Sequence, residues 1–401
     1  MKTHYILLII ICSFLHSCRG KSDSGTTGST SSDLSKMDRV VIENKPDFPV
    51  DSCFAKIEYV KLGNTGDVLI GQVTHLLFTP DHIIVGDNQN ANAVFVFDRK
   101  GNARTVINRF GRGPQEYLSI NDVFLTPDKK TIGITDRAGQ KLLYFDLDGR
   151  FKWKTSLPFS FYCSKTEWID DETMMLVSDG VHINSSPVSE SYPDKEDLLF
   201  ITDTTAQNIH GSTFVNPFDV HIFHHQPLDV KRFDDRIYAC KAFGDTIYQV
   251  TKESIFPRYW LDMKGIGGVA NFGKDITAEK LDAAPNYTNF PNIYVESDDY
   301  ALFILTKKNL MFPVLFNKQT KKTYNVDPSH SRTALGMHLL FAKFAHDKQF
   351  VAAVPAFQFL AFCPDVPGVE LQNEIKEGLT DEDNPVLLFY TLKDPDTPAV
   401  D

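Results

Sequence analysis

Three histidines lie within five residues of one another, at His221, His224 and His225. Imidazole nitrogens are common Zn²⁺ ligands, and a zinc ion held together with a carboxylate from another loop would supply a hydroxide for hydrolysis. No second ligand motif accompanies the three histidines in the sequence. The pattern therefore leaves two interpretations open: a zinc site, or a solvated loop in which one histidine packs against the protein.

A second set of candidate ligands consists of three carboxylates, Asp87, Asp136 and Asp179, each of which follows a short apolar run. If those runs are equivalent strands, the three carboxylates lie around one mouth of the fold, where their oxygens could hold Ca²⁺. Aspartates at strand ends also cap hairpin turns by accepting hydrogen bonds from backbone N–H groups. Turn capping is the simpler interpretation.

The segment from Arg109 to Tyr117 has the composition of a binding loop. Its two glycines permit unusual backbone angles and its proline fixes the exit of the chain. The loop presents Arg109, Arg112, Glu116 and Tyr117, and an arginine fork beside a phenol suits recognition of a carboxylate or of sugar hydroxyls. The alternative is a structural clasp between two parts of the fold, in which these side chains satisfy neighbouring backbone groups.

The composition narrows the classes of partner. Asp and Glu number 52 against 41 Lys and Arg, so the net charge is −11 and a broad nucleic-acid surface is not expected. The sequence contains no glycine-rich phosphate loop, no nucleophile elbow and no HExxH helix. These observations favour a small polar ligand over a nucleotide, and a binding protein over an enzyme.

The N-terminal segment predicts export. Lys2 precedes an apolar run from Tyr5 to Leu15 that is too short to span a membrane, and Leu15-His16-Ser17-Cys18 follows it. We expect residues 1–17 to be a lipoprotein signal peptide, with Cys18 as the lipidated first residue; simple secretion is the alternative. Residues 18–39 are rich in Gly, Ser and Thr and are expected to form a flexible tether.

Four cysteines remain beyond the expected lipidation site: Cys53, Cys163, Cys240 and Cys363. They are far apart and form no CxxC or other metal-binding spacing. The sequence predicts free buried thiols, and a disulfide is the alternative in an exported protein.

An internal repeat in the sequence predicts the strands that carry the candidate site residues. Thr79-Pro80-Asp81 recurs as Thr126-Pro127-Asp128, 47 residues later, and Phe97-Asp98 recurs as Phe145-Asp146, 48 residues later. Each Asp81-type turn joins two apolar runs, and similar turns occur at four further aspartates: Asp171, Asp235, Asp299 and Asp347. The sequence therefore contains six units with strand-turn-strand patterning, and four antiparallel strands per unit of about 40 to 50 residues are typical of the blades of a β-propeller.

The fold class we expect is therefore all-β: a six-bladed propeller of four-stranded antiparallel blades in a single domain covering residues 40–401. The last unit ends at Leu392 without a fourth strand. Residues Lys56 to Leu62 form an orphan strand before the first unit and are expected to close the last blade, which removes the exposed edges. The alternatives are a pair of β-sandwiches or a seven-bladed ring.

Long insertions indicate the working face. Strands alternate in direction, so the turns between second and third strands lie on the same face as the connections between blades. The excess residues fall in four stretches that belong to this face by that count: 181–196, 206–227, 263–292 and 362–385. Short helices are expected at residues 275–284 and 369–379. Long loops in a compact domain usually carry function.

Several segments resemble the lipid-anchored six-bladed β-propeller proteins of certain Gram-negative bacteria. Besides the signal segment and tether, they are Arg109 to Tyr117 (RFGRGPQEY), Phe243 to Tyr248 (FGDTIY) and Asp383 to Tyr390 (DNPVLLFY). The first two units also look like NHL repeats. The resemblance implies an outer-membrane or periplasmic lipoprotein, often associated with nutrient-uptake systems, and implies neither a substrate nor catalytic residues.

Taken together, the sequence predicts an exported protein that is attached to the outer membrane only through its lipid, on the periplasmic or the cell-surface side. It is expected to be a binding or docking module for a small polar ligand, a glycan or a peptide, with an uptake-system protein as the expected macromolecular partner. The alternative is a hydrolase or lyase that acts at the propeller mouth with a bound Ca²⁺ or Zn²⁺ ion.

Overall fold

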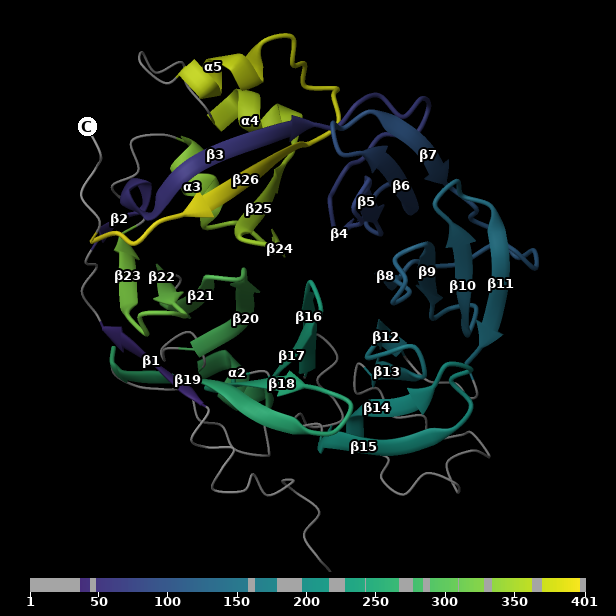
Figure 1. Cartoon of the computed structure of the whole chain (residues 1–401), viewed down its shortest axis with the longest axis horizontal. Helices are drawn as coiled ribbons and strands as arrows, with labels where there is room; N and C mark the ends of the chain where they lie inside the picture. Colours follow the sequence, from purple (N-terminus) through teal and green to yellow (C-terminus); the bar gives the residue numbers. More distant parts are fainter. Residues whose placement is uncertain are drawn as a thin grey trace, which may run out of the picture.

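The computed structural model describes most of the chain beyond the N-terminal segment. The described residues are 37–43, 48–157, 163–178, 197–215, 228–241, 243–266, 277–283, 289–308, 310–327, 334–362 and 370–396. They form six sheets arranged in a ring (Figure 1). Each sheet contains four consecutive antiparallel strands or their equivalent, which confirms the predicted six-bladed propeller.

The first three blades follow the chain in order. Blade 1 contains β4 (His75–Phe78), β5 (His82–Asp87), β6 (Ala93–Asp98) and β7 (Ala103–Ile107). Blade 2 contains β8 (Asp122–Leu125), β9 (Thr131–Asp136), β10 (Lys141–Asp146) and β11 (Phe151–Ser156). Blade 3 contains β12 (Cys163–Trp168), β13 (Thr173–Ser178), β14 (Asp197–Asp203) and β15 (Ile209–Val215).

The other three blades take strands from both ends of the chain. Blade 4 contains β16 (Leu228–Phe233), β17 (Arg236–Lys241), β18 (Thr246–Val250) and β19 (Ile255–Gly265). Blade 5 contains β20 (Asn289–Glu296), β21 (Tyr300–Lys307), β22 (Leu310–Asn317) and β23 (Thr323–Asp327). Blade 6 contains β24 (Phe344–His346), β25 (Gln349–Val354), β26 (Val386–Leu392) and, from the N-terminal part of the chain, β3 (Phe54–Lys61).

Burial along a blade explains its sequence pattern. The two central strands of blade 1, β5 and β6, are almost continuously apolar and buried because both faces of the sheet pack against neighbouring blades. The fourth strand of blade 2, β11, has the sequence FKWKTS and is largely exposed. Apolar runs therefore mark the middle of each blade, while mixed sequences mark its outer edge.

The ring closes as predicted. Strand β3 pairs with β26 in antiparallel register from Lys61 opposite Val386 to Phe54 opposite Leu392. Asn384 strengthens this junction, because its side chain accepts a hydrogen bond from the Ile70 N–H and donates one to the Gly63 carbonyl. The last blade therefore has no open edge toward solvent on its β26 side.

Two further N-terminal strands were not predicted. Strand β1 (Asp38–Glu43) pairs in parallel with β19 and adds a fifth strand to blade 4. Strand β2 (Phe48–Pro49) pairs in parallel with β23 at the edge of blade 5, just before a short 3-10 helix, η1 (Val50–Cys53). Strand β1 begins inside the segment that we expected to be tether.

The four α-helices within the described residues all lie in connections of the expected face. Helix α2 (Ala278–Ala283) follows blade 4, α3 (Ala334–Leu339) follows blade 5, and α4 (Ala356–Phe362) and α5 (Glu370–Lys376) lie between β25 and β26. One expected insertion was wrong in part: residues 206–227 include β15, the fourth strand of blade 3. None of the helices within the described ranges has the length and hydropathy needed to cross a membrane.

Candidate functional site

The loop from Arg109 to Tyr117 connects β7 of blade 1 to β8 of blade 2. The Tyr117 side chain is fully buried, and its hydroxyl lies 2.8 Å from the Asn92 carbonyl and 3.0 Å from the Ile107 carbonyl, so that it donates to one of them. The same hydroxyl accepts a hydrogen bond from the Arg109 N–H at 3.2 Å. A phenol in this position ties two strands of blade 1 to the loop.

Glu116 has a similar role within the loop. Its carboxylate accepts a hydrogen bond of 2.7 Å from the Gly113 N–H, and a Cβ atom at Gly111 would lie 2.1 Å from that carboxylate. Arg109 spans toward blade 2, with its guanidinium 5.8 Å from the centre of the Phe145 ring. Arg109 and Arg112 are the exposed members of the expected set. The geometry favours the clasp, and it leaves only the two arginines accessible to a ligand.

Asp87 and Asp136 occupy equivalent positions in blades 1 and 2 and act as turn caps. The buried Asp87 carboxylate accepts hydrogen bonds of 2.8 to 3.0 Å from four backbone N–H groups: those of Gly71, Gln72, Gln89 and Asn90. Asp136 accepts from the N–H groups of Leu118, Ser119 and Gly139. Although burial alone would raise the pKa of Asp87, these N–H groups lower it below its usual value. The carboxylate oxygens of Asp87 and Asp136 therefore already accept hydrogen bonds from backbone N–H groups.

The remaining predicted site residues lie outside the described part of the chain. They are Cys18, Asp179, His221, His224 and His225. Among the cysteines, Cys363 also lies outside, while Cys53, Cys163 and Cys240 are free and buried. Burial raises the pKa of Cys53 and of Cys163 to about 12, so these thiols are unreactive at neutral pH.

The structure instead brings charged side chains together in the central channel. The first strand of each blade lies nearest the axis of the ring (Figure 1). Between these strands is a cavity of about 290 Å³ to which every blade contributes. Its lining includes His75 of β4, Lys165 and Glu167 of β12, and Lys231 and Arg232 of β16.

These charges form a chain of ion pairs that runs across four blades. His75 Nε2 lies 3.2 Å from Asp122 Oδ1, and Lys165 Nζ lies 3.6 Å from the same oxygen. Lys165 Nζ is also 3.5 Å from Glu167, whose other oxygen accepts a hydrogen bond of 2.7 Å from Arg232 Nε. The Lys165–Glu167 pair lies within β12, and the other pairs join the inner strand of one blade to that of the next, so these ion pairs hold the wall of the channel together.

The pairing keeps the inner groups ionised. Burial opposes the charged form of Asp122, yet Lys165 and His75 lower its pKa below the usual value. Burial likewise disfavours the Lys165 ammonium, but Asp122, Glu167 and Asp229 raise its pKa above the usual value. The channel therefore presents full charges of both signs at neutral pH.

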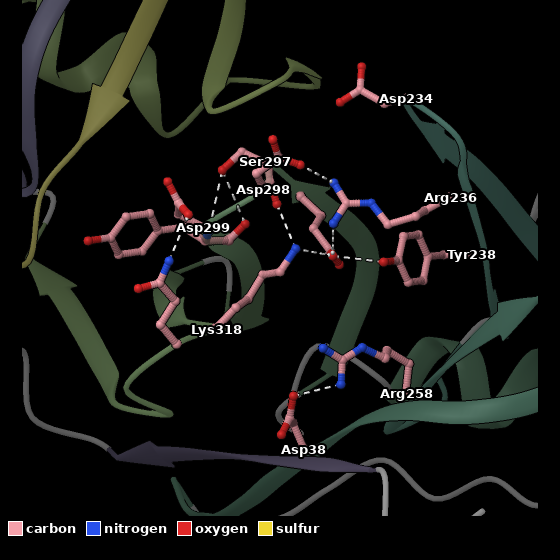
Figure 2. A network of polar contacts seen from close by, with 12 residues as sticks. Asp38, Asp234, Arg236, Tyr238, Arg258, Ser297, Asp298, Asp299 and Lys318 are labelled. Atoms are coloured by element: carbon pink, nitrogen blue, oxygen red, sulfur yellow. Dashed lines mark hydrogen bonds and ion pairs between the residues drawn. The ribbon is translucent and has the colours of Figure 1, made fainter.

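A second polar network lies between blades 4 and 5, beside the channel. The Glu296 carboxylate of β20 is 1% exposed and accepts hydrogen bonds from Lys318 at 2.6 Å, Tyr238 at 2.7 Å and Arg236 at 3.3 Å, as well as from Tyr294. Figure 2 shows Arg236, Tyr238 and Lys318 pointing toward one another from neighbouring blades. Because every partner comes from one of the two sheets, we assign this network to blade packing and not to ligand binding.

Sequence reasoning missed the channel residues because they form no contiguous motif. The available signal is the spacing of charges within the first strands: Lys165 and Glu167, like Asp229 and Lys231, are two residues apart and therefore point to the same face of a strand. Because the first strand of each blade lies nearest the axis of the ring (Figure 1), charges on one face of that strand in an otherwise apolar blade indicate a polar channel.

Comparisons with known proteins agree with this architecture. Residues 36–391 match the family model described as "Domain of unknown function (DUF4934)". No curated protein shows significant sequence similarity to the chain.

Among solved structures, a "Putative exported protein" of Bacteroides fragilis superposes with a TM-score of 0.69 at 19% identity, over 89% of this chain and 100% of that one. A member of the DUF4221 family from Bacteroides vulgatus gives a TM-score of 0.48 at 10% identity, over 85% of this chain and 97% of that one. At these identities the likeness concerns the fold.

Proposed function

We propose, from the premise that the chain belongs to the DUF4934 family, that this protein is an exported, lipid-anchored propeller that binds a small polar ligand in its central channel. The observation that carries the proposal is the cavity of about 290 Å³, which is lined by charged groups from the inner strands. Ligand pockets generally measure roughly 300 to 1,000 Å³, so this cavity suits a small ligand or one unit of a longer chain.

The two sides of the cavity differ in chemistry. Blades 3 and 4 supply the charged side, with Lys165, Glu167, Asp229, Lys231 and Arg232. The rest of the lining comes from blades 1, 2, 5 and 6; it is mainly apolar, with Leu77, Ile293 and Phe344 among its residues, and it also contains His75 and Lys343. A ligand with an apolar face and a polar edge fits this arrangement.

The charges of the lining are close to balance. Glu167 and Asp229 stand opposite Lys165, Lys231 and Arg232, and the buried Asp122 compensates the third cation, so the further lining residue Lys343 leaves an excess of one positive charge. A strongly charged ligand would leave part of this set unpaired, which is costly in a partly buried site. We therefore favour a neutral or zwitterionic ligand, and a glycan unit or a peptide end has this character.

The proposal that the protein is exported and lipidated is supported by the signal segment, Cys18 and the tether. A superposable protein described as exported is consistent with it. A module held at the outer membrane by its lipid would deliver a captured glycan or peptide to an uptake-system protein.

The binding proposal is tested with the chain purified as a soluble Cys18→Ala variant. A thermal-shift screen should use monosaccharides, uronic acids, amino acids and dipeptides, because a ligand that binds only the folded state raises the melting temperature. For any ligand found, Lys231→Met removes a charge of the lining, and Lys252→Met removes a surface lysine that is also paired with an aspartate.

We expect Lys231→Met to weaken binding about tenfold to a hundredfold, the effect of losing a charged hydrogen bond. Lys252→Met should leave the affinity unchanged. Equal affinity in both variants and the parent chain would exclude the channel as the binding site.

A further inference from the structure

Two turns meet at the end of the channel that lies opposite the helices. Asp234 follows β16 of blade 4, and His346 and Asp347 end β24 of blade 6. The residues just before them, Phe233 and Ala345, line the channel cavity. The three side chains therefore lie where the inner strands of two blades reach the far mouth of the channel.

Backbone hydrogen bonds fix the relative position of these turns. The Asp347 N–H donates to Asp234 Oδ2 at 3.1 Å, and the Asp298 N–H of blade 5 donates to the Asp347 carbonyl at 2.9 Å. Asp234 and Asp347 both have positive φ angles, of 54° and 50°. The bond between Asp298 and Asp347 joins blades 5 and 6 through backbone groups alone, whereas the link to blade 4 uses the Asp234 carboxylate.

The side chains converge without bonding one another well. One ligand atom from each of Asp234, His346 and Asp347 lies within 4.8 Å of the other two. His346 Nδ1 is 3.5 Å from Asp234 Oδ1, and His346 Nε2 is 3.5 Å from Asp347 Oδ2. Both distances exceed those of good hydrogen bonds.

The Nδ1 atom of His346 is not satisfied by a hydrogen bond. This atom is buried and has no hydrogen-bond partner among the described residues. The ring cannot easily turn toward solvent, because it stacks on Phe78 with 4.4 Å between ring centres. A buried polar atom without a partner is unfavourable, and a ligand between the histidine and the carboxylates would satisfy it.

The charges around the cluster permit a cation. Asp234 and Asp347 supply two acidic side chains, and Arg236 lies two residues after Asp234 on the same blade. Arg236 is itself bound to Glu296 and Asp298. Arg99, which lies over the Phe78 ring, adds positive charge near Asp347. We therefore expect moderate rather than very tight binding.

We propose that Asp234, His346 and Asp347 bind one Zn²⁺ ion, which joins blades 4 and 6 at the far mouth of the channel. One imidazole nitrogen and two carboxylate oxygens are a donor set that Zn²⁺ accepts, and water completes the coordination on the side of Asp347, whose side chain is 74% exposed. The ion bridges two blades that are not neighbours in the ring and so stabilises its closure.

The test uses the full-length chain titrated with ZnCl₂ by calorimetry, together with thermal melts. The parent chain should bind one Zn²⁺ ion more than the Asp347→Asn and His346→Gln variants, or should bind that ion at least tenfold more tightly. Zn²⁺ should also raise the melting temperature of the parent more than that of either variant. Matched controls are Asp128→Asn, in the corresponding turn of blade 2, and His82→Gln, at the start of β5 directly after the corresponding turn of blade 1. Both controls should bind Zn²⁺ like the parent.

Asp347→Asn is the decisive variant because the hydrogen bonds that place residue 347 use its backbone. Its melting temperature without metal should match that of the parent, which separates loss of binding from loss of folding. Absence of saturable Zn²⁺ binding, or equal stoichiometry and affinity in the parent and both site variants, would overturn the proposal. Tighter binding of Ca²⁺ than of Zn²⁺ at the same residues would overturn the assignment of the ion.

Discussion

Replacing Glu296 by glutamine keeps the shape of the side chain but removes the charge that joins blades 4 and 5. In the parent protein this carboxylate accepts hydrogen bonds from two cations, Arg236 and Lys318, and from two tyrosines, Tyr238 and Tyr294. The glutamine can still accept from a tyrosine, but its amide group places N–H donors against the donors of the cations. The variant therefore leaves positive charge buried without its counter-ion.

The expected loss of stability depends on the contacts that Arg236 and Lys318 keep in the variant. Breaking a buried ion pair costs about 3 to 5 kcal/mol when the remaining charge has no other partner. Arg236 keeps its contact with Asp298 at 3.1 Å, and Lys318 still donates to the Ser297 carbonyl at 2.8 Å. We therefore expect a loss near the lower end, about 3 kcal/mol in the free energy of unfolding.

Equilibrium unfolding in urea measures this loss, provided that the slope of the transition is unchanged. The control is Glu58→Gln, which breaks a pair with Lys56 in which both side chains are about half exposed or more. A surface pair of this kind contributes at most about 1 kcal/mol. A Glu296→Gln loss no larger than that of the control would refute the assignment of the network to blade packing.

The pH dependence gives a second readout of the same change. Burial lowers the pKa of Lys318 below its usual value even though Glu296 favours its charged form. Without Glu296 the pKa of Lys318 in the folded state should fall further, so the unfolded chain binds more protons than the folded chain over a wider range below pH 10.5. Stability rises with pH wherever that is so. The deficit of Glu296→Gln should therefore shrink as the pH is raised from 7 toward 10.

Three further predictions concern the anchor, the ring closure and the clasp. Cys18→Ala should move the protein from the membrane fraction to the soluble fraction, and quantitative retention in the membrane would contradict lipid anchoring. Deleting residues 384–401 removes β26 and with it the partner of β3, so circular dichroism should show unfolding of the whole ring; an unchanged melting transition would contradict this. Tyr117→Phe should lower the free energy of unfolding by about 1 to 3 kcal/mol, because it leaves the Arg109 N–H and a carbonyl of blade 1 without a buried partner. Arg112→Ala, at an exposed position of the same loop, should leave the melting temperature unchanged, and a large loss there would assign the clasp to Arg112 as well.

The ring could be predicted from the sequence because each blade repeats a strong local signal. Pairs of apolar runs joined by an acidic turn, which recur every 43 to 64 residues, determine the blade number, and the orphan strand before the first unit determines how the last blade closes. Both expectations rest on the local pattern of apolar residues in each strand, which tertiary packing does not override.

The missed elements lack such a signal. Strands β1 and β2 pair in parallel with the outer edges of blades 4 and 5, and nothing within the two segments indicates a partner more than two hundred residues away. Strand β15 has the sequence IHGSTFV, which contains a glycine and several polar residues and is poor in the alternation typical of strands.

The candidate site was harder to predict than the fold for a related reason. The Arg109 to Tyr117 loop attracted attention as a compact motif, but buried hydrogen bonds account for Tyr117 and Glu116. The charges of the channel come one to three at a time from separate blades, and only the ring brings them together. The sequence does not reveal these residues because they lie far apart in it, and not because their side chains are unsuited to binding.

The parallel pairing of β1 also has a mechanical consequence. The chain enters the ring at Asp38, whose carboxylate binds Arg258 at 2.6 Å and Lys321 at 2.9 Å, and it then runs along β19 before it reaches β3. Tension applied through the preceding segment would load the β1–β19 pair first and in shear, along the direction of the strands. The strand that closes the ring would bear that tension only after β1 had detached, so a pull on the N-terminal segment would remove an accessory strand while the closed ring stayed intact.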